Sequence, residues 1–158
     1  MPDSSFTGSR FVYVTYIRTT PEKLWAALTE PDLTRLWWCE TWQDCAWTKG
    51  ASWTAMIPDG RIADSGVILE IDRPRRLVFT WENQFVPEMR REGHSTVTYD
   101  LEVVGDSVKF TLTHEIGLEK SLLIGAVSEG WPHLLASLKS LLETGKPLAE
   151  TAKWPEGH

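Results

Sequence analysis

STVTYDLEVVGDSVKFTLTH, residues 95–114, is the stretch that decides the fold class of this chain. Residues of one face recur at every second position in both halves: Val97, Tyr99, Leu101 and Val103, then Val108, Phe110, Leu112 and His114. Mainly polar residues alternate with them, and Gly105-Asp106 between the halves is typical of a tight hairpin turn. The pattern predicts two antiparallel strands, over 95–104 and 107–114, with one buried face and one solvated face.

Further strands are predicted on the N-terminal side of this hairpin. The stretches rich in β-branched and aromatic residues are Phe11–Arg18, Ala51–Ile57, Ala63–Ile71 and Leu77–Glu82. Turn-forming residues divide the last three of them, at 58–60 and 72–74. In the last strand Leu77, Phe79 and Trp81 share one face, which we expect to continue the buried face of the hairpin.

Helices are expected after the first strand and after the last strand. Thr20 followed by Pro21 is a helix start, and Pro31 ends that helix and begins a second, short one that extends to Trp37. Leucines at three-to-four spacing predict a long amphipathic helix that ends at Gly145. Because a proline within a helix costs about 3 kcal/mol, either this helix begins near Ser128–Glu129 or it is kinked at Pro132, and we expect the later start. The sequence therefore predicts an α+β fold with the long helix across the apolar face of the sheet.

Length and composition restrict the classes of function. A chain of 158 residues fits one domain, assigned to residues 11–146, with a flexible N-terminus over 1–10 and a polar tail over 147–158. The formal net charge of −6 and the short arginine clusters argue against nucleic acid as a partner. No export signal or membrane-spanning stretch is evident, so a cytoplasmic protein with Cys39 and Cys45 as free thiols is expected.

Tryptophan is the unusual residue of this sequence. The chain has nine, and five of them lie close together: Trp37, Trp38, Trp42, Trp47 and Trp53. Because tryptophan joins a large apolar body to one N–H donor, such a cluster can cover a core, line an apolar cavity or form a surface for a partner. The residues alone leave these three alternatives open.

Several motifs in order resemble one family. They are TPEKLWAALTEP at 20–31, LWW at 36–38, PRRLVFTW at 74–81, LTHE at 112–115, GWP at 130–132 and LKSLLETG at 138–145. This series resembles the START-like SRPBCC superfamily, and within it the bacterial branch named after the activator of the heat-shock-protein-90 ATPase. The resemblance implies a helix-grip fold, also known from the birch-pollen allergen, in which a curved antiparallel sheet of about six or seven strands surrounds a long C-terminal helix and a cavity.

The resemblance also implies a ligand in that cavity. We expect a small apolar or aromatic ligand, with these residues as walls: Trp37, Trp38, Trp53, Met56, Phe79, Trp81, Tyr99, Phe110, His114 and Trp131. A cyclase- or hydrolase-type enzyme that uses His114 as acid or base and Tyr99 as donor is the alternative, although the sequence favours a binding protein without a reaction.

A partner-binding protein, with the tryptophan cluster as an exposed patch, is the third hypothesis. The eukaryotic co-chaperone that gives the branch its name carries a further chaperone-binding domain, which a chain of this length does not hold, so chaperone binding is doubtful. A weak homodimer is a possible assembly. No metal site or cofactor is expected, because the histidines and cysteines lack the spacing of a ligand set. The acidic residues Asp64, Glu70, Asp72 and Glu82 are expected on solvated strand faces or turns.

Overall fold

The computed structural model describes residues 6–155 and arranges seven antiparallel strands in one sheet, in the order β1-β7-β6-β5-β4-β3-β2. The strands are β1 (Ser9–Ile17), β2 (Trp42–Cys45), β3 (Ser52–Met56), β4 (Ile62–Asp72), β5 (Arg76–Asn83), β6 (Ser95–Val104) and β7 (Ser107–Ile116). The helices are α1 (Pro21–Thr29), α2 (Pro31–Trp37), α3 (Pro87–Arg90), α4 (Leu122–Thr144) and the 3-10 turn η1 (Ala149–Thr151). The predicted helix-grip architecture is confirmed.

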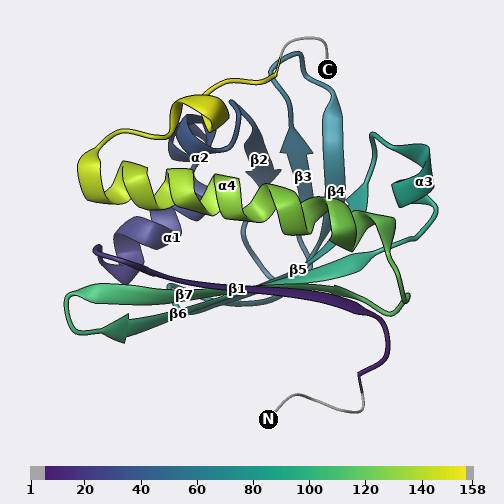
Figure 1. Cartoon of the computed structure of the whole chain (residues 1–158), viewed down its shortest axis with the longest axis horizontal. Helices are drawn as coiled ribbons and strands as arrows, with labels where there is room; N and C mark the ends of the chain where they lie inside the picture. Colours follow the sequence, from purple (N-terminus) through teal and green to yellow (C-terminus); the bar gives the residue numbers. More distant parts are fainter. Residues whose placement is uncertain (1–5, 156–158) are drawn as a thin grey trace.

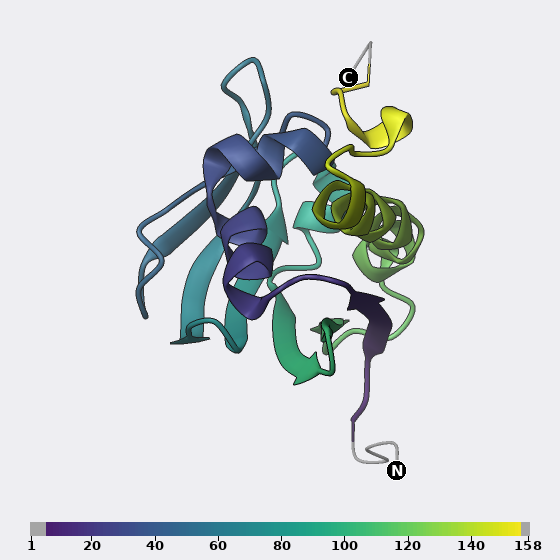
Figure 2. The ribbon, with the colours of Figure 1, turned by 90° about the vertical axis from the view of Figure 1, so that its left-hand side faces the viewer.

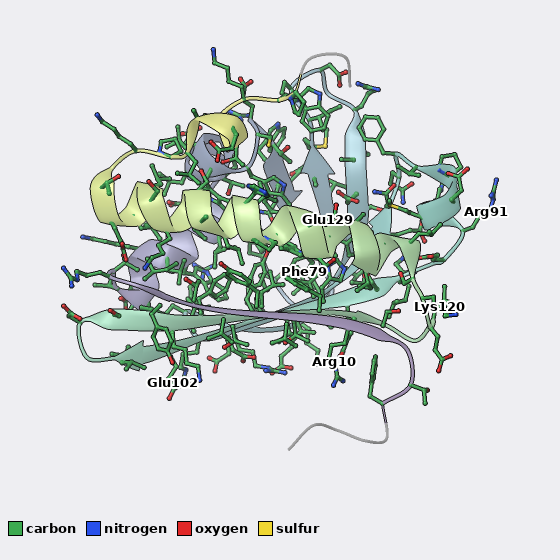
Figure 3. The ribbon with its side chains drawn as sticks, viewed as in Figure 1. Arg10, Phe79, Arg91, Glu102, Lys120 and Glu129 are labelled. Atoms are coloured by element: carbon green, nitrogen blue, oxygen red, sulfur yellow. The ribbon has the colours of Figure 1, made fainter. Side chains whose placement is uncertain are left out.

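The sheet is strongly curved around α4. Figure 1 shows α4 lying along β1, β7 and β6, with β2, β3 and β4 turned steeply against them. Figure 2, which looks nearly along α4, shows the sheet bending around one side of the interior while α1, α2 and α4 occupy the other. Phe79 lies in the layer between α4 and the strands, whereas Arg10 and Glu102 point away from it on the outer face (Figure 3).

The β6–β7 hairpin has the predicted register. Val97 lies opposite His114, and Leu101 lies opposite Phe110, so their side chains share the inner face. Val103 departs from the predicted pattern, because 62% of its surface is exposed. The reason is that β5 pairs with β6 only as far as Asp100. Val103 therefore lies beyond the part of β6 that is paired with β5.

The two short helices follow from local signals. Thr20 Oγ1 accepts a hydrogen bond from the Lys23 backbone N–H at 3.2 Å, which caps α1 as predicted. Leu24 and Leu28 are buried on the inner side of α1. The strand β2 was not predicted, because its four residues give too short an alternation to distinguish from a loop.

The long helix begins earlier than the predicted Ser128–Glu129 and contains Pro132 in its interior. Ser121 caps its first turn, and the Glu92 carboxylate accepts hydrogen bonds from the backbone N–H groups of Leu122 and Leu123, at 2.7 and 3.2 Å. These bonds satisfy N–H groups that a helix start leaves free, and Leu123 is buried. Together they offset the cost of the proline, so the prediction of a later start is wrong.

Both ends of the described chain take part in the fold. The first strand begins at Ser9, so Ser9 and Arg10 of the expected flexible N-terminus belong to the sheet. At the other end, Thr151 of the expected polar tail is buried. Residues 1–5 and 156–158 of those two predicted segments lie outside the described residues. Among the helices described, none is long and apolar enough to cross a membrane.

Candidate functional site

A pocket of about 750 Å³ opens between the inner face of β4 and β5, the first half of α4 and the C-terminal segment. Its lining is mainly apolar, with contributions from Ala63, Trp81, Phe85, Val86, Met89, Leu123, Ala126, Val127, Gly130, Trp131, Leu134, Trp154 and Pro155. This volume is in the range of pockets that hold small organic ligands.

Three tryptophans form one aromatic wall of this pocket. The ring centroids of Trp38 and Trp81 lie 5.9 Å apart, and Trp131 lies 5.5 Å from Trp38 and 5.6 Å from Trp81. They come from the end of α2, from β5 and from α4, so the three elements meet at this wall. Such close ring pairs hold one another in place, which gives the pocket a preformed side.

Asp64 is the buried charged residue of the pocket. It lies on β4 with 9% of its surface exposed, opposite Asn83 of β5, whose Nδ2 donates to Asp64 Oδ1 at 3.2 Å. Burial raises the pKa of Asp64 to about 7, although the Trp81 indole N–H and the Asn83 amide, both directed at the carboxyl, act in the opposite direction. The Trp81 N–H does not reach full hydrogen-bond geometry. The expectation of a solvated Asp64 is therefore wrong.

The sequence contains only a weak signal for the burial of Asp64. On β4 it shares its face with Ile68, which is buried, across the small Gly66. Val67 and Leu69, on the other face, are apolar but 40% and 44% exposed. Because apolar residues occupy both faces of this strand, alternation alone could not show which face is the inner one.

His114 belongs to a buried chain of hydrogen bonds behind the aromatic wall. The Trp131 indole N–H donates to His114 Nδ1 at 3.1 Å, so the ring proton of the neutral imidazole is on Nε2, which lies 2.7 Å from Ser95 Oγ. Ser95 Oγ in turn donates to the Trp81 carbonyl at 2.9 Å. Burial lowers the pKa of His114 to about 3, so the imidazole is neutral at physiological pH.

The predicted wall residues fall into two groups. Trp38, Trp81 and Trp131 line the pocket. The others lie outside its lining: Trp37, Trp53, Phe79, Tyr99, Phe110 and His114 in the buried core, and Met56, half-buried, on the face of β3 opposite to Trp53. Burial raises the pKa of the Tyr99 hydroxyl above its ordinary value.

Two tryptophans of the cluster have hydrogen-bonded indole N–H groups inside the protein. Trp37 Nε1 donates to the Ala27 carbonyl at 2.9 Å, and Trp53 Nε1 donates to Gln43 Oε1 at 2.8 Å. Trp37, Trp38 and Trp53 are each less than 9% exposed. The hypothesis of an exposed tryptophan patch for a partner therefore loses its main residues.

The charges around the pocket are mainly acidic. Asp64 and Glu150 line it, together with the ionisable side chains of His133 and Cys39, and no lysine or arginine is part of the lining among residues 6–155. Burial, followed by the nearby Glu40 carboxylate, raises the pKa of the Cys39 thiol, so this thiol is kept protonated. Residues 6–155 also contain no group of three or more histidine, cysteine or acidic side chains that could hold a metal ion.

A family model described as Activator of Hsp90 ATPase homolog 1-like protein matches residues 18–143. The chain belongs to this family. The predicted resemblance is thus confirmed, and the match covers strands β2 to β7, the helices α1 to α3 and nearly all of α4, whereas β1 precedes it. No curated protein matches the chain.

Solved structures agree with this family on the fold. DynU16, a protein of the dynemicin biosynthetic locus, is 20% identical with a TM-score of 0.74, over 98% of this chain and 52% of that one. The Aha1 dimer from Colwellia psychrerythraea is 20% identical with a TM-score of 0.69, over 87% and 98% of the two chains. An Hsp90 activator from Plasmodium falciparum is 23% identical with a TM-score of 0.62, over 78% and 88%.

Proposed function

We propose that this family member binds a small, largely apolar ligand in the pocket between β4, β5 and α4. The observation that carries the proposal is the pocket of about 750 Å³ with its wall of Trp38, Trp81 and Trp131. An apolar body placed there would leave water and contact aromatic faces that are already in position. With Cys39 and Cys45 as free thiols, a reducing cytoplasm is the compartment that we propose for this binding.

The catalytic alternative built on His114 and Tyr99 has less support. His114 is hydrogen-bonded at both ring nitrogens, and both residues are buried outside the pocket lining. A general acid or base must come within hydrogen-bond reach of its substrate. A substrate in this pocket would meet the Trp81 and Trp131 rings instead of His114, so we propose binding without a role of His114 in chemistry.

The test uses a probe and a variant that fills the pocket. N-phenyl-1-naphthylamine is a neutral, apolar fluorophore of suitable size, and its emission increases in an apolar environment. Gly130 lines the pocket on α4, and a Cβ added there would meet no atom within 4 Å. Gly130→Leu should therefore fill part of the pocket, stay folded and weaken probe binding at least tenfold.

A matched control lies on the same helix. Gly125 has the same open surroundings but is outside the lining, so Gly125→Leu should bind the probe as the wild type does. Probe binding should also raise the melting temperature of the wild type, because a ligand that binds only the folded state stabilises it. Equal probe affinity of Gly130→Leu and the wild type, or no binding by the wild type, would contradict the proposal.

A further inference from the structure

We propose that the ligand of this pocket is a lipophilic cation, a protonated amine on an apolar body, with the Asp64 carboxylate as its counter-ion. This inference rests on the proposed function, which supplies the apolar part of the ligand. The pocket combines an aromatic wall with a carboxyl group that is nearly as buried as the core. Burial of an ionisable group is unfavourable unless a partner compensates it, which an ammonium group would do.

The hydrogen bonds of Asp64 leave room for such a partner. A carboxylate offers about four acceptor positions. Asn83 Nδ2 donates to Oδ1 at 3.2 Å, and the Trp81 N–H approaches without reaching full geometry. Each of these is a neutral donor, so neither compensates the charge of the ionised carboxylate. An ammonium group in the pocket would supply both further donors and the opposite charge.

The aromatic wall favours the same ligand chemistry. An ammonium group near a tryptophan face is attracted by the negative side of the ring, and tryptophan is the strongest of the aromatic residues in this respect. The rings of Trp38, Trp81 and Trp131 stand together beside Asp64 in one lining. A pocket built from indole faces and a buried carboxylate therefore suits an amine with an aromatic or aliphatic body.

The remaining charges of the pocket disfavour other ligand classes. Glu150 adds a second carboxylate, and the lining within residues 6–155 contains no lysine or arginine. An anionic ligand would thus approach like charges without a cationic side chain to bind it. A wholly apolar ligand would cover Asp64 and remove it from water without giving it a donor.

Amine binding should also be linked to a proton. Burial raises the pKa of Asp64 to about 7, so near neutrality a part of the molecules carries the carboxyl in its protonated form. An incoming ammonium group favours the ionised form, and the proton of the carboxyl leaves to solvent. The other ionisable groups that face the pocket are His133 on α4, Cys39 after α2 and Glu150 in the C-terminal segment.

The experiment compares three compounds of nearly one shape: 1-naphthylmethylamine, which is protonated at neutral pH, the neutral 1-naphthylmethanol and the anionic 1-naphthoate. Each competes with N-phenyl-1-naphthylamine in the wild type and in Asp64→Asn. In the wild type at pH 8 we expect the amine to bind at least tenfold more tightly than the alcohol, and the anion to bind most weakly. The amine affinity should fall several-fold between pH 7 and pH 6, as Asp64 becomes protonated.

In Asp64→Asn the preference for the amine and its dependence on pH should both disappear, while the alcohol and the fluorescent probe bind at least as tightly as in the wild type, because they no longer cover a buried carboxyl. Retained probe binding shows that the pocket is intact in the variant. Asp44→Asn, which removes an exposed carboxylate outside this lining, should keep the preference.

Equal affinity for amine and alcohol in the wild type, or an amine preference that persists in Asp64→Asn, would overturn the inference and leave the proposed function standing. Failure of the probe and of all three compounds to bind would overturn both.

Discussion

Asp64 and His114 are two buried ionisable residues in which the same cause acts in opposite directions. Burial disfavours the charged form, so it raises the pKa of the acid to about 7 and lowers the pKa of the base to about 3. His114 has a neutral hydrogen-bond partner at each ring nitrogen, so its neutral imidazole needs no charged partner. Asp64 lines a pocket instead, which is why the two residues differ in what they can do.

The pKa of Asp64 leads to a prediction on stability. Because the folded state holds the proton more tightly than the unfolded state, it binds more protons between about pH 4 and pH 7, and stability from this group falls as the pH rises. The amide that replaces the carboxyl in Asp64→Asn cannot titrate. This variant should therefore gain stability relative to the wild type as the pH rises from 4 to 8, by up to about 4 kcal/mol.

Urea unfolding of both proteins at several pH values measures this difference. The His114 contribution has the opposite sign, since its folded pKa lies below the unfolded value and stability from it is lost as the pH falls below about 6.5. It is present in both proteins and cancels in the comparison. A difference in stability that stays constant from pH 4 to pH 8 would show that Asp64 is not a carboxyl with a raised pKa.

At the scale of elements, α4 lies along the inner face of the sheet for most of the length of the helix. Leu138 is fully buried in the core on this helix, whereas Leu122 at its first turn is 55% exposed. Leu138→Ala should lower the free energy of unfolding by about 2–5 kcal/mol, through lost burial and the cavity that remains. Leu122→Ala, the matched control, should change it by less than about 0.5 kcal/mol. Denaturant unfolding measures both, and equal effects would mean that α4 does not hold the sheet through this face.

The elements were predictable where a local signal decided them. The β6–β7 hairpin followed from alternation and from Gly105-Asp106, and α1 followed from its cap at Thr20. The start of α4 was not predictable in this way, because the carboxylate of Glu92 that binds its first N–H groups is about 30 residues away in the sequence. Contacts of this kind exist only once the chain is folded.

At the scale of the whole molecule, the pocket likewise depends on contacts that local sequence signals do not predict. Trp38, Trp81 and Trp131 were expected as walls of a ligand cavity, yet only the fold decides that Trp81 lines the pocket while Phe79, two residues away on the same strand, fills the core. Asp64 and Trp154 were missed because their places at the pocket depend on elements distant in sequence. Trp154 is brought to the pocket by a segment whose Thr151 carbonyl accepts a hydrogen bond from the Cys39 backbone N–H at 2.8 Å.

The C-terminal segment lines the pocket with Glu150, Thr151, Trp154 and Pro155, so a ligand bound as we propose would contact it. The Trp154 ring stacks on Phe85, with centroids 6.2 Å apart, and its backbone N–H donates to Glu40 Oε1 at 3.1 Å. Because Trp154 belongs to the pocket lining and is only half-buried, Trp154→Ala should speed dissociation of N-phenyl-1-naphthylamine several-fold, while stability falls by no more than about 1 kcal/mol. Trp42→Ala, in a separate cavity beside α1, is the control and should leave the rate unchanged. Stopped-flow displacement measures the rates, and equal rates in Trp154→Ala and the wild type would show that ligands leave by another route.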